Sequence, residues 1–195
     1  MGHAARVAVM TADEYLAWEA VQTERHDFVD GEVFAMARAE DRHVTVSLNV
    51  AMALRQHLAG STCRTFMADM KVAAAHDRSF FYPDVVVTCS ESDRASPVVK
   101  REPVLIVEVL SPSTAAYDLG EKFTAYTDIG TLQEVAFIDL DTRRSNVCRK
   151  GADGLWVLHP FGPADAVHFA SVSLQLPAET LFAEVDDELG TDLKR

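Results

Sequence analysis

The feature of this sequence that most constrains its fold is an acidic residue inside an otherwise apolar run. Six of the seven residues from Val104 to Leu110 are apolar. A continuous run of this kind predicts a strand that is covered on both faces. The exception is Glu108, whose carboxylate would lose several kcal/mol of hydration free energy unless it is paired or bound to a cation. The run therefore predicts either a buried ion pair with an arginine or a cation site.

A second acid precedes another apolar run. Tyr82-Pro83-Asp84 leads into Val85-Val86-Val87. If the two strands are neighbours, side chains facing each other across them stand roughly 5 Å apart, close enough to share one ion. Two carboxylates, a backbone carbonyl and water suit a hard cation such as Mg²⁺ or Mn²⁺. Taken alone, Asp84 would be interpreted as part of a Pro-Asp turn at a strand entrance.

A third candidate, Lys122, lies on a predicted helix. Asp118 followed by Glu121 indicates an N-cap, and the helix should run from Leu119 to about Asp128 and stop before Gly130. A lysine beside two metal-binding carboxylates can position an attacking water and stabilise charge that develops on a phosphate. Attack of a metal-activated water on a phosphodiester is the reaction that such a group of residues performs. In isolation, Lys122 would be a solvated helix residue.

The remaining pattern is that of a mixed α and β domain. Asp30-Gly31 between two apolar-bearing runs predicts a β-hairpin. The segment 90–100 is predicted to be a polar loop. Helices are predicted at 12–20, after a Thr11/Glu14 capping box, and at 43–59, and strands at 63–67, 70–74, 84–89, 104–110, 134–139, 146–149, 155–158 and 172–176.

The totals describe one globular domain over residues 1–195, with a polar C-terminal tail at 186–195. A net charge of −12 weighs against strong non-specific binding to nucleic acid, although part of the excess is explained if a cation site exists. No apolar run approaches the roughly 20 residues of a membrane span, and no signal peptide is recognisable. We therefore expect a cytoplasmic protein without a membrane partner.

The three cysteines, Cys63, Cys89 and Cys148, stand in unrelated segments. Their odd number and the absence of a CxxC spacing suggest neither a disulfide framework nor a zinc site. Reduced thiols are the simplest interpretation.

The motifs together resemble the Uma2 family of bacterial proteins, within the PD-(D/E)XK nuclease superfamily. The resemblance covers about residues 11–158. It is carried by the strings Glu24-Arg25-His26, Asp30-Gly31-Glu32, His43, Tyr82-Pro83-Asp84, Glu102-Pro103, Val107-Glu108-Val109-Leu110-Ser111-Pro112-Ser113-Thr114, Tyr117-Asp118, Gly120-Glu121-Lys122, Glu134-Val135, Ile138-Asp139 and Leu155-Trp156.

The resemblance implies an α/β (α+β) fold with a restriction-endonuclease-like core, in which helices flank a mixed central β-sheet with extra β-hairpins. It also implies a homodimer. It assigns metal binding to Asp84 and Glu108, assisted by the main-chain carbonyl of Val109. The lysine expected two positions after the glutamate is absent, because Leu110 stands there. In this family the amine is thought to move to the following helix, where Lys122 stands.

Two further residues are secondary candidates for the site. Glu32 would reach the metal from the hairpin, or is simply solvated, and His43 would orient a water or phosphate, or merely opens a helix. Asp69 and Lys71 alternate on a strand flanking the proposed site and are interpreted as an exposed pair.

Two hypotheses of different classes follow. The first is a Mg²⁺- or Mn²⁺-dependent endonuclease that hydrolyses phosphodiester bonds in DNA, with RNA or a smaller phosphodiester as other possible substrates. The second is a dimeric binding or regulatory module that keeps the nuclease fold without turnover. The acidic surface favours the second hypothesis, and the presence of Asp84, Glu108 and Lys122 favours the first.

Overall fold

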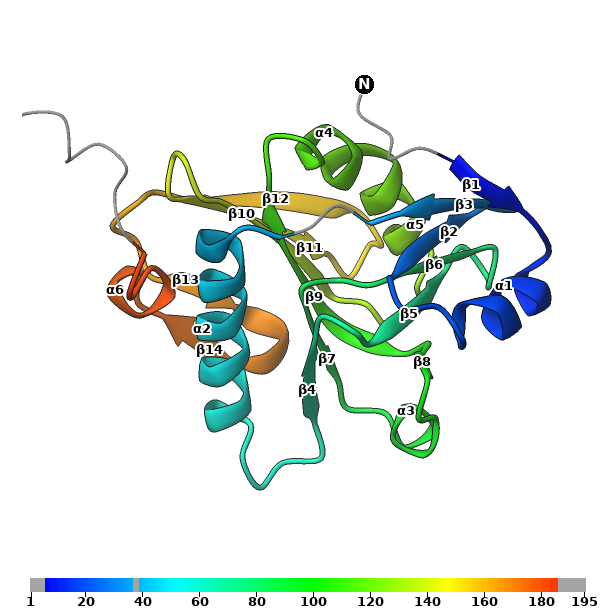
Figure 1. The fold of residues 1–195 in the computed structure, drawn as a ribbon. Helices are drawn as coiled ribbons and strands as arrows, with labels where there is room; N and C mark the ends of the chain where they lie inside the picture. The colour runs from blue at the N-terminus through cyan, green and yellow to red at the C-terminus, as the bar shows by residue number, and fades with distance from the viewer. Residues whose placement is uncertain (1–5, 37–38, 186–195) are drawn as a thin grey trace, which may run out of the picture.

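The computed structural model describes residues 6–36 and 39–185, so the predicted polar tail at 186–195 lies outside the described residues. Two sheets organise this part of the chain (Figure 1). The first has the order β1-β3-β2-β6-β5-β8, with β1 at Arg6–Val9, β3 at Glu32–Ala35, β2 at His26–Val29, β6 at Ser79–Phe81, β5 at Lys71–Ala74 and β8 at Val99–Lys100. The second has the order β12-β11-β10-β9-β7-β4, with β12 at Trp156–Phe161, β11 at Arg144–Lys150, β10 at Glu134–Asp139, β9 at Pro103–Leu110, β7 at Val85–Thr88 and β4 at Arg64–Met67.

The second sheet is the mixed central sheet that the family resemblance implies. Strand β9 pairs in parallel with β10 and antiparallel with β7, so the strand that carries Glu108 is central. The segments expected only as extra hairpins join into the first sheet. A short third sheet pairs β13 (Val167–Phe169) with β14 (Leu174–Leu176).

Helices cover both sheets. They are α1 (Ala12–Glu19), α2 (Asp41–His57), α3 (Glu91–Ala95), α4 (Ala115–Tyr117), the π-helical turn η1 (Asp118–Lys122), α5 (Phe123–Thr127), the 3₁₀ turn η2 (Ala170–Val172) and α6 (Ala178–Leu181). The capping box at the start of α1 is confirmed, with Thr11 and Glu14 bonded reciprocally. Within the described ranges, no helix combines the length and the apolar character that crossing a membrane requires.

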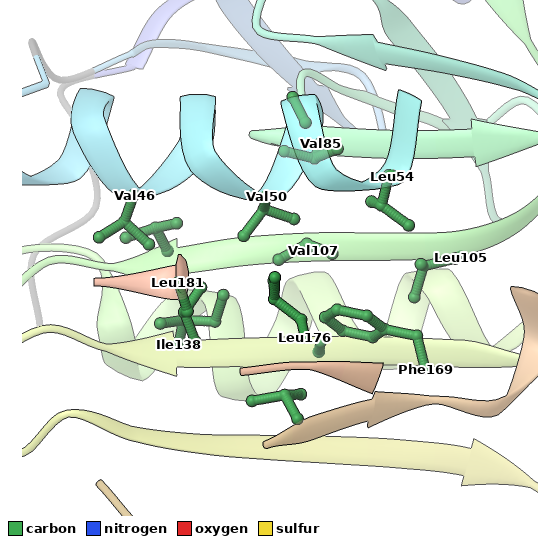
Figure 2. Close-up of a cluster of buried hydrophobic side chains, with 14 of the residues drawn as sticks. Val46, Val50, Leu54, Val85, Leu105, Val107, Ile138, Phe169, Leu176 and Leu181 are labelled. Atoms are coloured by element: carbon green, nitrogen blue, oxygen red, sulfur yellow. The ribbon is translucent and has the colours of Figure 1, made fainter. Parts of the chain in front are cut away.

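The apolar run around β9 is buried on both faces, as predicted. On one face, α2 packs Val46, Val50 and Leu54 toward Val107 and Leu105 (Figure 2). On the other face, Ile106 and Leu110 pack with residues of α5 and of the first sheet, including Tyr126 and Phe81. Glu108 lies between Ile106 and Leu110 and therefore points into the space between the two sheets, because alternate residues of a strand share a face.

Two local predictions are wrong. The segment 90–100 is not only a loop, because it contains α3 and β8; the Ser90 side chain caps α3 by accepting a hydrogen bond from the Asp93 backbone. The helix predicted from Leu119 begins earlier, at Ala115, and Asp118 lies inside it rather than at its N-cap. The sequence signal was misleading because the Asp118 side chain bonds Lys122 instead of the helix backbone.

The prediction that all cysteines are reduced is also wrong, because Cys63 and Cys89 form a disulfide. Strands β4 and β7 pair antiparallel with Arg64 opposite Thr88. The same register, continued by one residue, brings the two cysteines opposite each other, which sequence spacing cannot reveal. Cys148 is a free thiol.

The disulfide should stabilise the pairing of β4 with β7. It closes a loop between positions 26 apart in sequence, so replacing both Cys63 and Cys89 by serine should lower the free energy of unfolding by about 3 kcal/mol. Urea unfolding followed by circular dichroism measures this change, with Cys148→Ser as the control. Identical unfolding curves for the double variant and the wild type would contradict the disulfide.

Candidate functional site

The site forms where β9 continues past the end of β7. Val85 pairs with Val107, and the same register carried one step further places Asp84 opposite Glu108. The negative charge of Asp84 adds to the effect of burial in raising the pKa of Glu108. The two acids that the sequence singles out therefore converge, from two neighbouring strands, on one side of the central sheet.

Beyond the end of β7, a side chain instead of a neighbouring strand bonds the backbone of β9. The Val109 amide donates a hydrogen bond of 2.7 Å to Asp84 Oδ2. His43 Nε2, from the first turn of α2, lies 3.3 Å from the same oxygen, and the ring also bonds the Val109 backbone. Burial opposes protonation of His43, but the hydrogen bond and the negative charge of Asp84 outweigh it and raise the histidine pKa. The Val109 backbone thus lies beside Asp84 and His43, the two side chains of this group that are partly exposed.

Lys122 completes the group from the opposite side. Its Nζ lies 2.9 Å from Glu108 Oε1 and 3.4 Å from Asp118 Oδ1, one turn earlier in η1. The Tyr126 hydroxyl donates to the same Glu108 oxygen at 2.7 Å. All four side chains are buried. A π-helical turn at this position is typical of functional sites, and here it aims Lys122 and Asp118 at one another.

Protonation at the centre of the group is set by burial and by an excess of acids. Burial raises the pKa of Glu108, and Asp118 and Asp84 push in the same direction while the ammonium of Lys122 opposes them. Burial disfavours the Lys122 ammonium, but Glu108, Asp27 and Asp118 reverse the effect and hold its pKa well above the usual value. Lys122 is therefore an ammonium at neutral pH.

Asp27 is a member of the group that the sequence analysis missed. It lies on β2, is 9% exposed and interacts with the charge of Lys122. Its Oδ1 is buried and has no hydrogen-bond partner. Burial raises the Asp27 pKa to about 6. The available signal was an acid within the apolar first arm of the predicted hairpin, between His26 and Phe28.

Asp118 and Tyr126 were missed for different reasons. Asp118 was interpreted as a helix cap, and a tyrosine in an amphipathic helix has no pattern that separates it from core residues. Glu32, in contrast, lies next to the turn of the β2–β3 hairpin. It pairs with Val29 at one end of the β2–β3 hairpin, whereas Asp84 follows the end of the first sheet at which His26 pairs with Ala35.

The donor set fits a divalent cation held partly by backbone. In the described ranges, no group of three or more histidine, cysteine, aspartate or glutamate side chains is arranged to hold a metal ion. Asp84 and Glu108 supply two carboxylates, and the backbone of Val109, whose amide bonds Asp84, lies beside them. Burial and two neighbouring acids raise the pKa of Glu108, and Asp27 Oδ1 has no hydrogen-bond partner, so this space holds acidic oxygens that a cation would satisfy.

The fold is shared with a solved structure described as a "putative nuclease belonging to DUF820" from Anabaena variabilis. The two structures superpose with a TM-score of 0.72, covering 89% of this chain and 97% of the other at 18% identity.

Two proteins of Synechocystis sp. (strain PCC 6803) are similar in sequence. The uncharacterized protein slr1290 is 32% identical over 173 residues, covering 89% of this chain and 91% of its own length. The uncharacterized protein sll1609 is 35% identical over 157 residues, covering 79% and 88%. The model of a family described as "Putative restriction endonuclease" matches residues 12–180, a span that includes every member of the buried group. The chain belongs to this family, Uma2.

Proposed function

We propose that the protein is a Mg²⁺- or Mn²⁺-dependent endonuclease that hydrolyses phosphodiester bonds in DNA. The observation that carries this proposal is the convergence of acids around Lys122. Four carboxylates, those of Asp27, Asp84, Glu108 and Asp118, gather around one ammonium and one imidazole. Buried charge of one sign is costly, and a divalent cation supplies the missing positive charge.

Asp84, Glu108 and the Val109 carbonyl would hold the cation. Bound there, the cation would supply Lewis-acid stabilisation of the phosphate and an activated water. The Asp84 and His43 side chains are about one fifth exposed, whereas Glu108 and Lys122 are buried. A phosphodiester therefore approaches from the side of Asp84 and His43.

Lys122 serves this reaction as a positive hydrogen-bond donor rather than as a base. Its raised pKa keeps it protonated at neutral pH. Held by Glu108 and Asp118, its ammonium is pre-positioned to stabilise charge on a phosphate oxygen and to orient a water. The Tyr126 hydroxyl fixes the Glu108 carboxylate in this arrangement.

A second candidate function is a nuclease-fold module that binds a partner as a homodimer without turnover. The net charge of −12 favours it, because a surface of this charge repels a polyanion. The two functions differ in whether the protein cleaves DNA.

The first prediction concerns cleavage. Wild-type protein should cleave plasmid DNA in Mg²⁺ or Mn²⁺, and Asp84→Asn and Lys122→Met should each lower the rate at least ~100-fold. The matched control is Asp77→Asn, which changes a surface aspartate paired with Arg101. Equal nicking by wild type and Asp84→Asn would identify a contaminating nuclease and remove the enzyme hypothesis.

The second prediction concerns metal binding without substrate. Mn²⁺ should raise the melting temperature of the wild type, because a ligand of the folded state stabilises that state. The shift should disappear in Asp84→Asn and persist in Asp77→Asn. A shift of the same size in both variants would place the cation elsewhere.

The third prediction concerns Asp27 in the absence of a divalent cation. Its folded-state pKa of about 6 lies above the ordinary 3.8, so the folded state binds the proton more tightly and loses stability as pH rises between these values. Asp27→Asn removes this loss and should stabilise the protein by about 2 to 3 kcal/mol at pH 7.5.

Urea unfolding of wild type and Asp27→Asn in EDTA, at pH 4 and pH 7.5, measures this effect. The stability difference between the two proteins should be small at pH 4. A difference that does not change between the two pH values would contradict a raised pKa for Asp27.

A further inference from the structure

A second polar cluster lies on the face of the first sheet that α1 covers. The register pairs Phe28 with Phe80 and Val72 with Phe81. Continued along the strands, the same registers align His26, Tyr82 and Lys71 in one row. Asp27 and Phe81 belong to the opposite face, toward Glu108, because neighbouring residues of a strand alternate. The cluster is thus distinct from the group around Lys122, although both lie at the same end of the sheet.

Lys71 is the anomaly in this cluster. The sequence suggested an exposed residue, but Lys71 is only 4% exposed. Its Nζ lies 5.2 Å from the centre of the Tyr15 ring and 5.4 Å from that of Tyr82. Among the described residues, no hydrogen-bond acceptor or ion-pair partner contacts it. Cation–π contacts offset only part of the cost of burying an ammonium. Lys71 Nζ is not among the fully buried polar atoms of the described ranges that have no hydrogen-bond partner, so it keeps contact with solvent and is open to an anion.

The carboxylate of the cluster is already occupied. Glu19 accepts hydrogen bonds from the His26 amide at 3.1 Å and from the Tyr82 hydroxyl at 2.8 Å, and it lies 3.0 Å from His26 Nδ1. It attracts Lys71 electrostatically but forms no ion pair with it. These bonds instead fix the Tyr82 ring against which Lys71 lies.

A second cation shares that ring. The Arg25 guanidinium lies 5.9 Å from the centre of the Tyr82 ring, and its side chain is 38% exposed. Its partner, Asp69, is 3.2 Å away and largely exposed, and a surface pair of this kind contributes little. Burial lowers the pKa of Lys71, and the neighbouring Arg25 lowers it further. Two cations that contact the same aromatic ring favour an anion close to both.

The position of the cluster indicates which anion. Tyr82 lies two residues before Asp84, roughly 7 Å of extended chain, and its backbone also bonds Asp27. Resting on the function proposed above, we propose that Lys71 and Arg25 form a phosphate subsite. It binds a backbone phosphate of the DNA strand beside the phosphate that is cleaved at Asp84 and Glu108. The subsite supplies the local positive charge that a protein of net charge −12 needs to hold a polyanion.

Binding measured without cleavage tests this proposal. Fluorescence anisotropy of a labelled DNA duplex of about 20 base pairs, in EDTA and between about 50 and 200 mM NaCl, gives the affinity and its salt dependence. Lys71→Met should weaken binding about tenfold and reduce the salt slope by about 1, the value of one phosphate contact. Arg25→Gln should weaken binding less, because Asp69 already neutralises part of its charge.

Matched controls separate a local contact from net charge. Lys150→Met removes a lysine that lies against the Trp156 ring on β11. Arg78→Gln removes an arginine paired with a surface aspartate, Asp30, at the other end of the same sheet. Both controls should keep the wild-type affinity and slope. Far-UV circular dichroism checks folding, and the comparison of Arg25→Gln with Arg78→Gln remains decisive if Lys71→Met does not fold.

Three results would each overturn the subsite. They are an unchanged affinity and salt slope in Lys71→Met, a loss in Lys71→Met equal to that of the controls, and no DNA binding by the wild type. The outcome is independent of turnover. Weaker binding by Lys71→Met in a protein that never cleaves DNA would support the subsite and refute the endonuclease. Cleavage at wild-type affinity by Lys71→Met would do the reverse.

Discussion

The ion pair between Lys122 and Glu108 is the interaction on which the interior of this protein depends. It joins the central strand β9 to the helical segment that follows it, in a space closed by the first sheet. A buried pair repays its desolvation only when further hydrogen bonds complete it, and Tyr126 and Asp118 do so here. The surrounding acids nevertheless exceed the cations, so this part of the core is organised for charge rather than for maximal stability.

The space around this pair exists because β9 extends beyond its neighbour β7. Strand β9 spans Pro103–Leu110, whereas its pairing with β7 extends only to Val107. The uncovered stretch of β9 carries Glu108. The Asp84 side chain, at the entrance of β7, bonds the backbone of this stretch, and His43 of α2 contacts the same Asp84 carboxylate. The paired strands therefore hold the site rigidly, and the end of β9 beyond β7 leaves one edge of the site accessible.

The central sheet and the pair of acids could be predicted because each leaves a local signal. A carboxylate within the run Val104–Leu110 marks both the buried strand and its anomaly, and Asp30-Gly31 marks the hairpin through its positive φ angles of 46° and 95°. The contribution of Asp27 arises from the pairing of β2 with β6, which sequence spacing does not encode. The Cys63–Cys89 bond and the burial of Lys71 likewise depend on strand register. The sequence around Asp118 suits either a helix N-cap or a buried partner of Lys122, and only the π-helical turn of the folded chain decides between these two roles.

The bond between Asp84 and the Val109 amide gives this acid a structural task besides the chemical role proposed for it. An aspartate at this position satisfies a backbone donor that β7 leaves unpaired, whether or not any reaction takes place. A relative that had lost catalysis would still be under pressure to keep an acceptor here. An aspartate at this position in a homologue is therefore weak evidence for catalysis. A lysine at position 122 is the more informative marker of it.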